Sequence, residues 1–184
     1  LWAERLSGNV QPVNLLSDYE DPLIRTYEGM VVTRTLDQEF LDALYHLGRY
    51  HGGNLQTSLL ALTKAALFLH TGQEDFIVGT DSPGRLDPAN HFRVGPYNRS
   101  LPIRSIFRQN DSWDSFHMEL IRNLKESYQH MDYPLSAALE TGHSKAEASR
   151  MQLYNVYVSV REDCRQFYFG ENLEVAMVQE ESCT

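Results

Sequence analysis

The stretch Gly72-Gln73-Glu74-Asp75-Phe76-Ile77-Val78-Gly79-Thr80 carries the clearest signal of the fold. Its short apolar run lies between glycines and predicts a buried strand over 75–79. The residues just before it, 55–70, are apolar almost all round, which predicts a helix buried between layers. The residues just after it, 82–88, are dense in turn formers and predict a loop.

Outward from this unit, strands and helices alternate. Further strands are predicted at 27–36, 101–107, 153–160 and 174–178, with a short one at 167–169. Helical spacing predicts a short opening helix over 1–6, a helix from Phe40 that stops at Gly52-Gly53, one over 113–128 and a short one over 135–139. The best periodic signal is the helix at 113–128, with Ser112 as its N-cap. This order indicates an α/β fold, a mixed sheet covered by helices.

Composition excludes several classes of function. The chain has 184 residues, 42% hydrophobic residues and a formal net charge of −9, with no cluster of basic residues. A nucleic-acid partner is therefore not expected. The longest apolar stretch, 59–69, is too short to span a membrane and contains Lys64. Cys164 and Cys183 lack companions for a zinc site or a disulfide scaffold, and we interpret them as thiols of a cytoplasmic protein.

Six segments resemble, in order, the later sequence blocks of condensation domains from nonribosomal peptide synthetases. They are residues 1–8, 16–19, 72–80 with Gly84-Arg85, 94–104, 130–134 and 149–150. Residues 94–104 stand where the family has Val-Gly-x-Phe-Val-Asn-Thr-Leu-Pro-Leu-Arg, and His130-Met131-Asp132-Tyr133-Pro134 is similar to its His-Gln-Asp-Tyr-Pro block. Residues 1–8 look like the block that begins the second lobe.

The resemblance implies one lobe of a two-lobed fold similar to chloramphenicol acetyltransferase, with a tunnel between the lobes. Two carrier proteins would deliver pantetheine-tethered acyl groups to that tunnel, where an amide, or less often an ester, forms. Peptidyl or acyl carrier proteins and the N-terminal lobe are therefore the expected partners, and no membrane partner is expected. No metal or directly bound cofactor is implied, because phosphopantetheine arrives on the carriers.

The family's His-His-x-x-x-Asp-Gly motif is missing, since the seven histidines include no adjacent pair. We interpret residues 1–184 as a partial C-terminal lobe, cut at both ends, without the catalytic N-terminal lobe and a final Phe-Asp-Leu segment. The chain alone is expected to be inactive. It is also expected to self-associate through its open lobe face.

The resemblance also assigns site residues. Tunnel or floor positions are Ser82, Arg85, Asn98, Arg99 and Ser100, and structural motif positions are Gly95, Arg104, Asp132, Tyr133, Pro134 and Arg150. Arg104 is expected to hold a buried carboxylate across the lobe interface, and the alternative is a strand-end arginine in solvent. Arg99 either faces the tunnel, where it would meet substrate or pantetheine phosphate, or lies on the surface beside a turn.

Departures from the family pattern leave alternatives open. Asn98-Arg99-Ser100 places a charge where the family has an amide. The chain could come from an unusual subclass of condensation enzyme or from an inactive relative that docks a carrier protein without chemistry. It could also come from an acyltransferase of the same architecture that uses free coenzyme A.

Overall fold

The computed structural model describes residues 1–8, 11–17, 29–82, 84–85, 87–108, 110–135 and 153–161, and the short strands at 167–168 and 174–175. Its elements are α1 (Trp2–Arg5), α2 (Gln38–Tyr50), α3 (Leu55–Thr71), β1 (Asp75–Ser82), the 3-10 helix η1 (Pro88–Asn90), β2 (Arg99–Ile106), α4 (Trp113–Gln129), β3 (Tyr157–Val158), β4 (Phe167–Tyr168) and β5 (Glu174–Val175).

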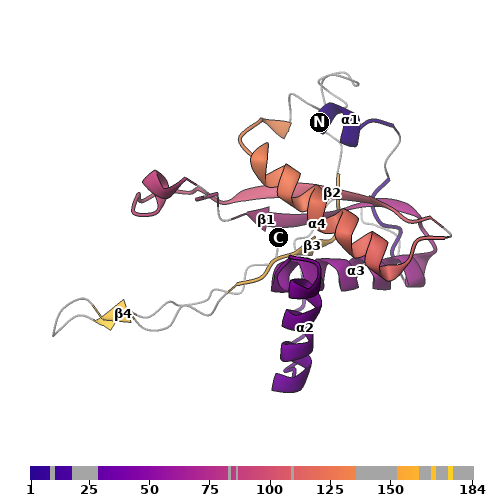
Figure 1. The fold of residues 1–184 in the computed structure, drawn as a ribbon, viewed down its shortest axis with the longest axis horizontal. Helices are drawn as coiled ribbons and strands as arrows, with labels where there is room; N and C mark the ends of the chain where they lie inside the picture. Colours follow the sequence, from indigo (N-terminus) through magenta and orange to yellow (C-terminus); the bar gives the residue numbers. More distant parts are fainter. Residues whose placement is uncertain are drawn as a thin grey trace.

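Strand β1 forms the centre of a three-stranded sheet with the order β2-β1-β3 (Figure 1). It pairs antiparallel with β2 over its whole length, from Asp75 opposite Ile106 to Ser82 opposite Arg99. It pairs parallel with β3, where Gly79 lies opposite Tyr157. The predicted mixed sheet is thereby confirmed. Strands β4 and β5 form a separate antiparallel pair.

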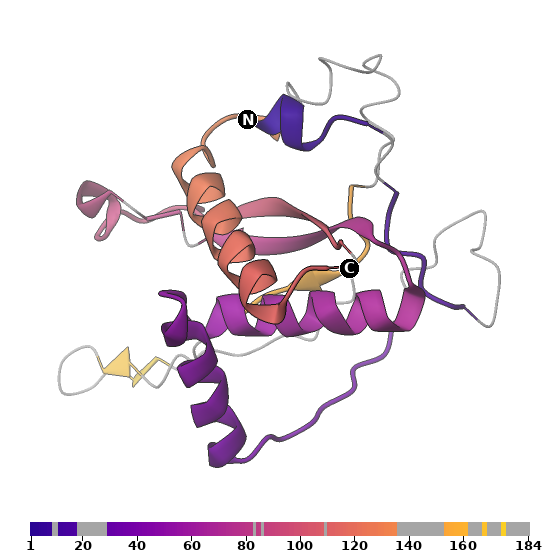
Figure 2. The ribbon, with the colours of Figure 1, turned by 45° about the vertical axis from the view of Figure 1, so that its right-hand side comes forward.

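Helices α3 and α4 pack against each other and against the sheet, α3 on β3 and α4 on β2 (Figure 2). Asn54 caps α3 by accepting the Thr57 N–H, and Ser112 caps α4 as predicted, by accepting the Ser115 N–H. The core joins buried apolar side chains of both helices and of β1 and β2, among them Leu60, Ala61, Phe76, Ile77, Val78, Leu101, Ile103, Phe116, Leu120 and Leu124.

Helix α3 is less evenly buried than its composition predicts. Leu69 is 82% exposed, whereas Lys64 is completely buried. The Lys64 Nζ donates a hydrogen bond to the carbonyl oxygen of Ile103, at 2.7 Å, and lies 5.2 Å from the centre of the Phe76 ring. Helix α3 contacts α2, α4 and β3, in line with the predicted position between layers. Composition does not reveal which of its side chains stay exposed.

Helix α2 projects away from the sheet and contacts α3 (Figure 1). The helix ends at Tyr50, just before Gly52-Gly53, as predicted. Gly52 has a φ of +74°, which is incompatible with a right-handed helix. The strand predicted over 27–36 is wrong in its described part, since 29–37 contains no strand and Val31 is 60% exposed. Strand preference reflects packing against a neighbour. No strand among the described residues pairs with this segment.

Strand β3 is shorter than the predicted 153–160. The helix predicted at 135–139 is described only at Leu135, and Arg150, Cys164 and Cys183 lie outside the described residues. Within the described ranges, no helix has both the length and the apolar character that crossing a membrane requires.

Candidate functional site

The loop between β1 and β2 is organised by the side chain of Arg85. Its guanidinium donates hydrogen bonds to the carbonyl oxygens of Asn90, Arg93 (2.6 Å) and Gly95 (3.3 Å). It also lies 4.2 Å from the centre of the Tyr97 ring. Because one planar cation satisfies three carbonyl groups, the loop has a defined shape without a core of its own. We call residues 84–97, of which 86 is not described, the Arg85 loop.

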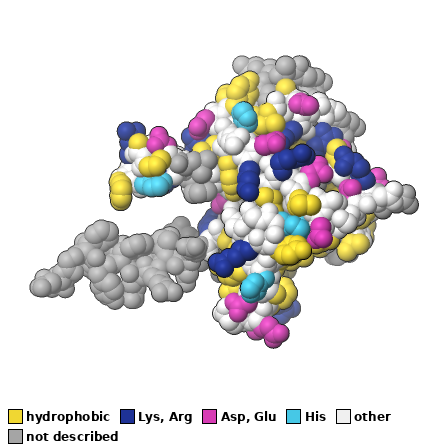
Figure 3. Space-filling view, viewed as in Figure 1, with side chains coloured by type: hydrophobic (Ala, Val, Ile, Leu, Met, Phe, Trp, Pro, Cys, Tyr) yellow, Lys and Arg dark blue, Asp and Glu magenta, His cyan; other side chains and the backbone are white. Residues whose placement is uncertain are grey.

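A glycine is required just before this arginine. Gly84 has a φ of +65°, a conformation that side-chain-bearing residues rarely adopt. A Cβ built there would overlap the carbonyl oxygen of Tyr97. The Gly84-Arg85 pair therefore brings the start and the end of the loop together. In Figure 3 the loop stands out from the body of the molecule.

The Arg85 loop, the start of β2 and the end of α4 line an open pocket of about 300 Å³, which we call the loop cavity. Its lining is rich in polar and charged side chains. The lining residues are Gly84, Asp87, Asn90, Tyr97, Arg99, Tyr128, Gln129, Met131 and Asp132. Three of the sequence blocks that carry the resemblance thus meet at one place.

Two of the predicted site residues, Arg99 and Asp132, line this cavity from opposite ends of the β2–α4 unit. Ser82 is buried beside it, where its hydroxyl donates to the Met131 Sδ at 3.4 Å and accepts the Gly84 N–H at 3.3 Å. Arg85 acts through the loop, because its guanidinium is occupied by backbone carbonyl groups.

The remaining predicted residues that the structure describes do not line the cavity. The side chain of Asn98 is exposed, and the Ser100 hydroxyl lies 3.4 Å from the Tyr157 hydroxyl. Gly95, with a φ of +153°, shapes the Arg85 loop. Tyr133 and Pro134 follow the end of α4 and are exposed, and Arg150 lies outside the described residues.

A chain of hydrogen bonds supports the cavity from behind. Tyr128 donates its hydroxyl to Gln56 Oε1 at 3.1 Å, and Gln56 Nε2 donates to Thr80 Oγ1 at 2.9 Å and to the Asp81 carbonyl oxygen at 2.8 Å. Burial, with a smaller contribution from the Asp81 carboxylate, raises the pKa of Tyr128 to about 12. The Tyr128 phenol is therefore neutral and acts as a hydrogen-bond donor.

Several lining residues were missed from the sequence. Tyr128 has the spacing of a core residue on α4, which conceals the polar role of its hydroxyl. Tyr97 lines the cavity, and Arg85 stacks on its ring. The turn formers Gly95-Pro96 predict a loop at this point. No local sequence pattern shows that the Tyr97 ring will pack against Arg85.

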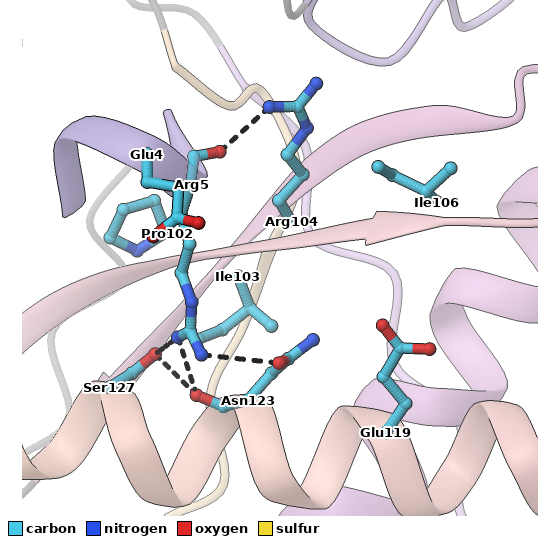
Figure 4. A pocket seen from close by; sticks show the side chains of 9 residues that line it. All are labelled: Glu4, Arg5, Pro102, Ile103, Arg104, Ile106, Glu119, Asn123 and Ser127. Atoms are coloured by element: carbon cyan, nitrogen blue, oxygen red, sulfur yellow. Dashed lines mark hydrogen bonds between the residues drawn. The ribbon is translucent and has the colours of Figure 1, made fainter. Parts of the chain in front are cut away.

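A second, smaller hollow of about 220 Å³ lies between α1, β2 and α4 (Figure 4). Arg5 reaches across it and donates to the Asn123 carbonyl oxygen at 3.0 Å and to Ser127 Oγ at 2.9 Å, with Glu126 as its ion-pair partner. Arg104 donates to the carbonyl oxygens of Arg5 and Ser7. The arginines are thus already satisfied by the protein, and this hollow is a structural junction.

Arg104 also forms a two-pronged ion pair with Asp75 on the neighbouring strand, at 2.8 Å from Nε and 2.6 Å from Nη2. The partner carboxylate therefore belongs to the neighbouring strand of the same sheet, and the expected carboxylate across a lobe interface is not the partner of Arg104. The hydrogen bond with Asp75 raises the pKa of Arg104, so the guanidinium stays charged.

Among the described residues, no group of three or more His, Cys, Asp or Glu side chains could hold a metal ion. The loop cavity offers the guanidinium of Arg99, the carboxylates of Asp87 and Asp132, and hydroxyl and amide groups.

Comparisons with known proteins identify the family of this chain. Residues 1–181 match the family described as condensation domain. Surfactin synthase subunit 1 of Bacillus subtilis (strain 168) is 30% identical over 160 residues, which are 87% of this chain and 4% of that protein. The chain thus spans a small fraction of the length of this relative.

Solved structures share the fold. The four-domain nonribosomal peptide synthetase holo-AB3403, bound to AMP and glycine, superposes with a TM-score of 0.74 and 17% identity over 87% of this chain and 12% of that one. The X-domain in its complex with OxyB from teicoplanin biosynthesis gives a TM-score of 0.71 and 22% identity over 85% of this chain and 34% of that one. With a family match over almost its whole length, the chain belongs to the condensation domain family of nonribosomal peptide synthetases.

Proposed function

We propose that this chain is the C-terminal lobe of a condensation domain that joins two carrier-bound acyl groups through an amide or, less often, an ester bond. The observation that carries the proposal is the loop cavity. There the Arg85 loop, β2 and the end of α4 present one polar wall. The wall would face a tunnel completed by an N-terminal lobe, and the Arg85 loop would form its floor.

In the proposed reaction, the amine of an acceptor aminoacyl group attacks the carbonyl carbon of a donor thioester. A C–N bond forms, the C–S bond breaks, the donor carrier leaves as a free thiol and the amine loses a proton. This chain has no adjacent histidine pair, so the group that handles that proton belongs to the N-terminal lobe. The role of this lobe is to orient the acceptor and to exclude water, which would hydrolyse the thioester.

The partners in this proposal are two carrier proteins, and the phosphopantetheine arms that they bear supply the thioesters. Carrier proteins and synthetase would act together in the cytoplasm. The chain itself would hold no cofactor.

The test uses the longest protein that the gene containing this chain encodes. Two carriers, one loaded with an acyl thioester and one with an aminoacyl thioester, are mixed with it, and the amide product is followed by mass spectrometry. Product from loaded carriers supports the proposal. Product from acyl-coenzyme A alone would instead identify a coenzyme A-dependent acyltransferase.

The same assay tests the role of the loop. Arg85→Gln removes the cation that holds the loop carbonyl groups. We expect this variant to lower the condensation rate by more than tenfold, because a displaced loop no longer orients the acceptor for attack. Arg93→Gln is the matched control, since only the backbone of Arg93 contacts Arg85. Equal rates for both variants would argue against a floor role for the loop.

A second candidate is a lobe that docks a partner without chemistry. The observation in its favour is the charged Asn98-Arg99-Ser100 segment at the end of the cavity lining, where catalytic relatives are expected to carry an amide. The X-domain, which shares the fold, was solved in complex with OxyB. Carrier binding without product in the assay above would select this candidate.

A further inference from the structure

Arg99 is an arginine with unused hydrogen-bonding capacity on the wall of the loop cavity. Its side chain reaches only backbone carbonyl oxygens of its own segment, those of Pro96, Tyr97 and Asn98, at 3.5, 3.4 and 3.2 Å from Nη1. These are long contacts for a charged donor, whose hydrogen bonds are usually about 2.7–2.9 Å. All three use the same nitrogen.

The other donors of this guanidinium have no protein acceptor in the described part of the chain. Arg99 forms none of the ion pairs found there, in contrast to Arg5 and Arg104, whose carboxylate partners are Glu126 and Asp75. The Nε and Nη2 groups of an arginine form a planar fork that fits one carboxylate. Arg99 therefore offers such a fork to a ligand.

The cavity offers carboxylates as well. Asp132 makes no hydrogen bond or ion pair with the described residues, and Asp87 uses Oδ1 to accept the N–H of Ala89. Both carboxylates line the same space as Arg99. A ligand that complements this lining carries an amine that donates hydrogen bonds to the aspartates and a carboxylate that accepts hydrogen bonds from the arginine.

We propose that the loop cavity recognises an acceptor aminoacyl group with a carboxylate in its side chain, and that Arg99 is the residue that selects it. This inference rests on the proposed function, because that function supplies an acceptor with a free amine. A phosphate group fits less well, since its two negative charges would lie close to the two aspartates. The volume of about 300 Å³ matches the lower end of the range for small-molecule sites.

The test is a minimal pair of ligands. The α-amide of L-glutamate and the α-amide of L-glutamine both have a free amine and a neutral α-carbonyl group, and they differ only in the side-chain carboxylate. Binding to the 184-residue chain is titrated by NMR through the Arg99 Nε–H signal and the backbone amides of 97–100. We expect the glutamate amide to bind about tenfold more tightly, the lower end for a hydrogen bond to a charged group.

Variants assign the preference to one side chain. Arg99→Gln should reduce the preference to about twofold or less, and Arg99→Lys should retain part of it, since it keeps the charge and loses the fork. Arg93→Gln, an exposed arginine of the same loop outside the lining, should change nothing. Asp132→Asn should weaken both ligands alike, because both carry the amine.

Equal affinity for the two amides, a preference that survives in Arg99→Gln, or no binding of either ligand would each overturn the inference. The proposed function fails by a different result, the absence of amide product from loaded carriers. If loaded carriers give amide product with neutral acceptors and with acidic acceptors at equal rates, the proposed function stands and only the selection of a carboxylate by Arg99 is overturned.

Discussion

The indole N–H of Trp2 donates a hydrogen bond to the carbonyl oxygen of His130 at 2.9 Å, across 128 positions of the sequence. Trp2 lies in α1 and is 4% exposed, and His130 is the C-cap residue that follows α4. The same carbonyl oxygen also accepts the Tyr133 N–H at 3.2 Å, so Trp2 supplies the second of two donors to a carbonyl group at the end of the helix. The Trp2 bond also fixes α1 beside the residues that lead into the loop cavity.

Replacing Trp2 separates the bond from the packing. Trp2→Phe keeps most of the ring and removes the donor, so we expect a loss of about 1–2 kcal/mol in the free energy of unfolding. Trp2→Ala also removes core packing and should cost about 3–5 kcal/mol. Urea unfolding gives both values. Trp113→Phe is the control, because the Trp113 indole N–H has no partner among the described residues, and a loss as large there would argue against the assignment.

The ion pair of Arg104 with Asp75 should contribute modestly. Asp75 is 37% exposed at its side chain, so water screens part of the attraction. We expect Arg104→Lys, which loses the two-pronged geometry and the bonds to α1, to cost about 1–2 kcal/mol. Arg108→Gln should cost close to nothing, because Arg108 is 61% exposed and its Glu119 partner is 3.8 Å away. Similar losses from both variants in urea unfolding would contradict this ranking.

The sequence predicted the elements whose signals are local. Helices α2, α3 and α4 have periodic apolar residues and caps such as Asp37 and Ser112. Strand β1 contains the predicted buried run 75–79 and continues to Ser82. The segment 29–36 misled because a strand also requires a neighbour, and residues such as Val32 carry no information on which strand that would be. Local patterns therefore identify elements and leave pairing open.

The candidate site follows the same division. Arg85, Arg99 and Asp132 were selected through the family blocks, and two of these residues, Arg99 and Asp132, line the cavity. That they meet depends on the fold of the Arg85 loop, which the guanidinium holds through backbone carbonyl groups. Carbonyl groups are present at every residue, so no sequence pattern reveals which of them a side chain will contact.

The buried amine of Lys64 should make stability depend on pH. Burial lowers the pKa of Lys64 from 10.5 to about 7, and the charge of Asp75 opposes this only in part. Between these two values the unfolded chain binds a proton that the folded chain does not, so stability rises as the pH rises. The gain is complete above the unfolded pKa, and it is lost as the pH falls toward 7.

Lys64→Met isolates this contribution, because methionine fills a similar space and does not titrate. From pH 7.5 to 9.5 the free energy of unfolding of the wild type should increase by about 2–3 kcal/mol relative to that of the variant. Urea unfolding of both proteins at the two pH values measures the difference. Parallel pH profiles would show that the Lys64 amine is charged in the folded state.

The shape of the loop cavity should depend on a single hydrogen atom at Gly84. A methyl group there would overlap the Tyr97 carbonyl oxygen, and the φ of +65° adds strain, so Gly84→Ala should displace the Arg85 loop. Gly72→Ala is the matched control. Gly72 has a φ of +68° and open space around its Cα, and its substitution should cost only the strain, about 1 kcal/mol.

The two variants should differ in where the change appears. Amide chemical shifts of 87–99 should move widely in Gly84→Ala and little in Gly72→Ala, while the core signals of β1 and α4 stay in place in both. The loop contributes no residue to the described core, so its displacement leaves the fold intact and removes the cavity. Unchanged loop shifts in Gly84→Ala would mean that the contact between Gly84 and Tyr97 does not hold the Arg85 loop.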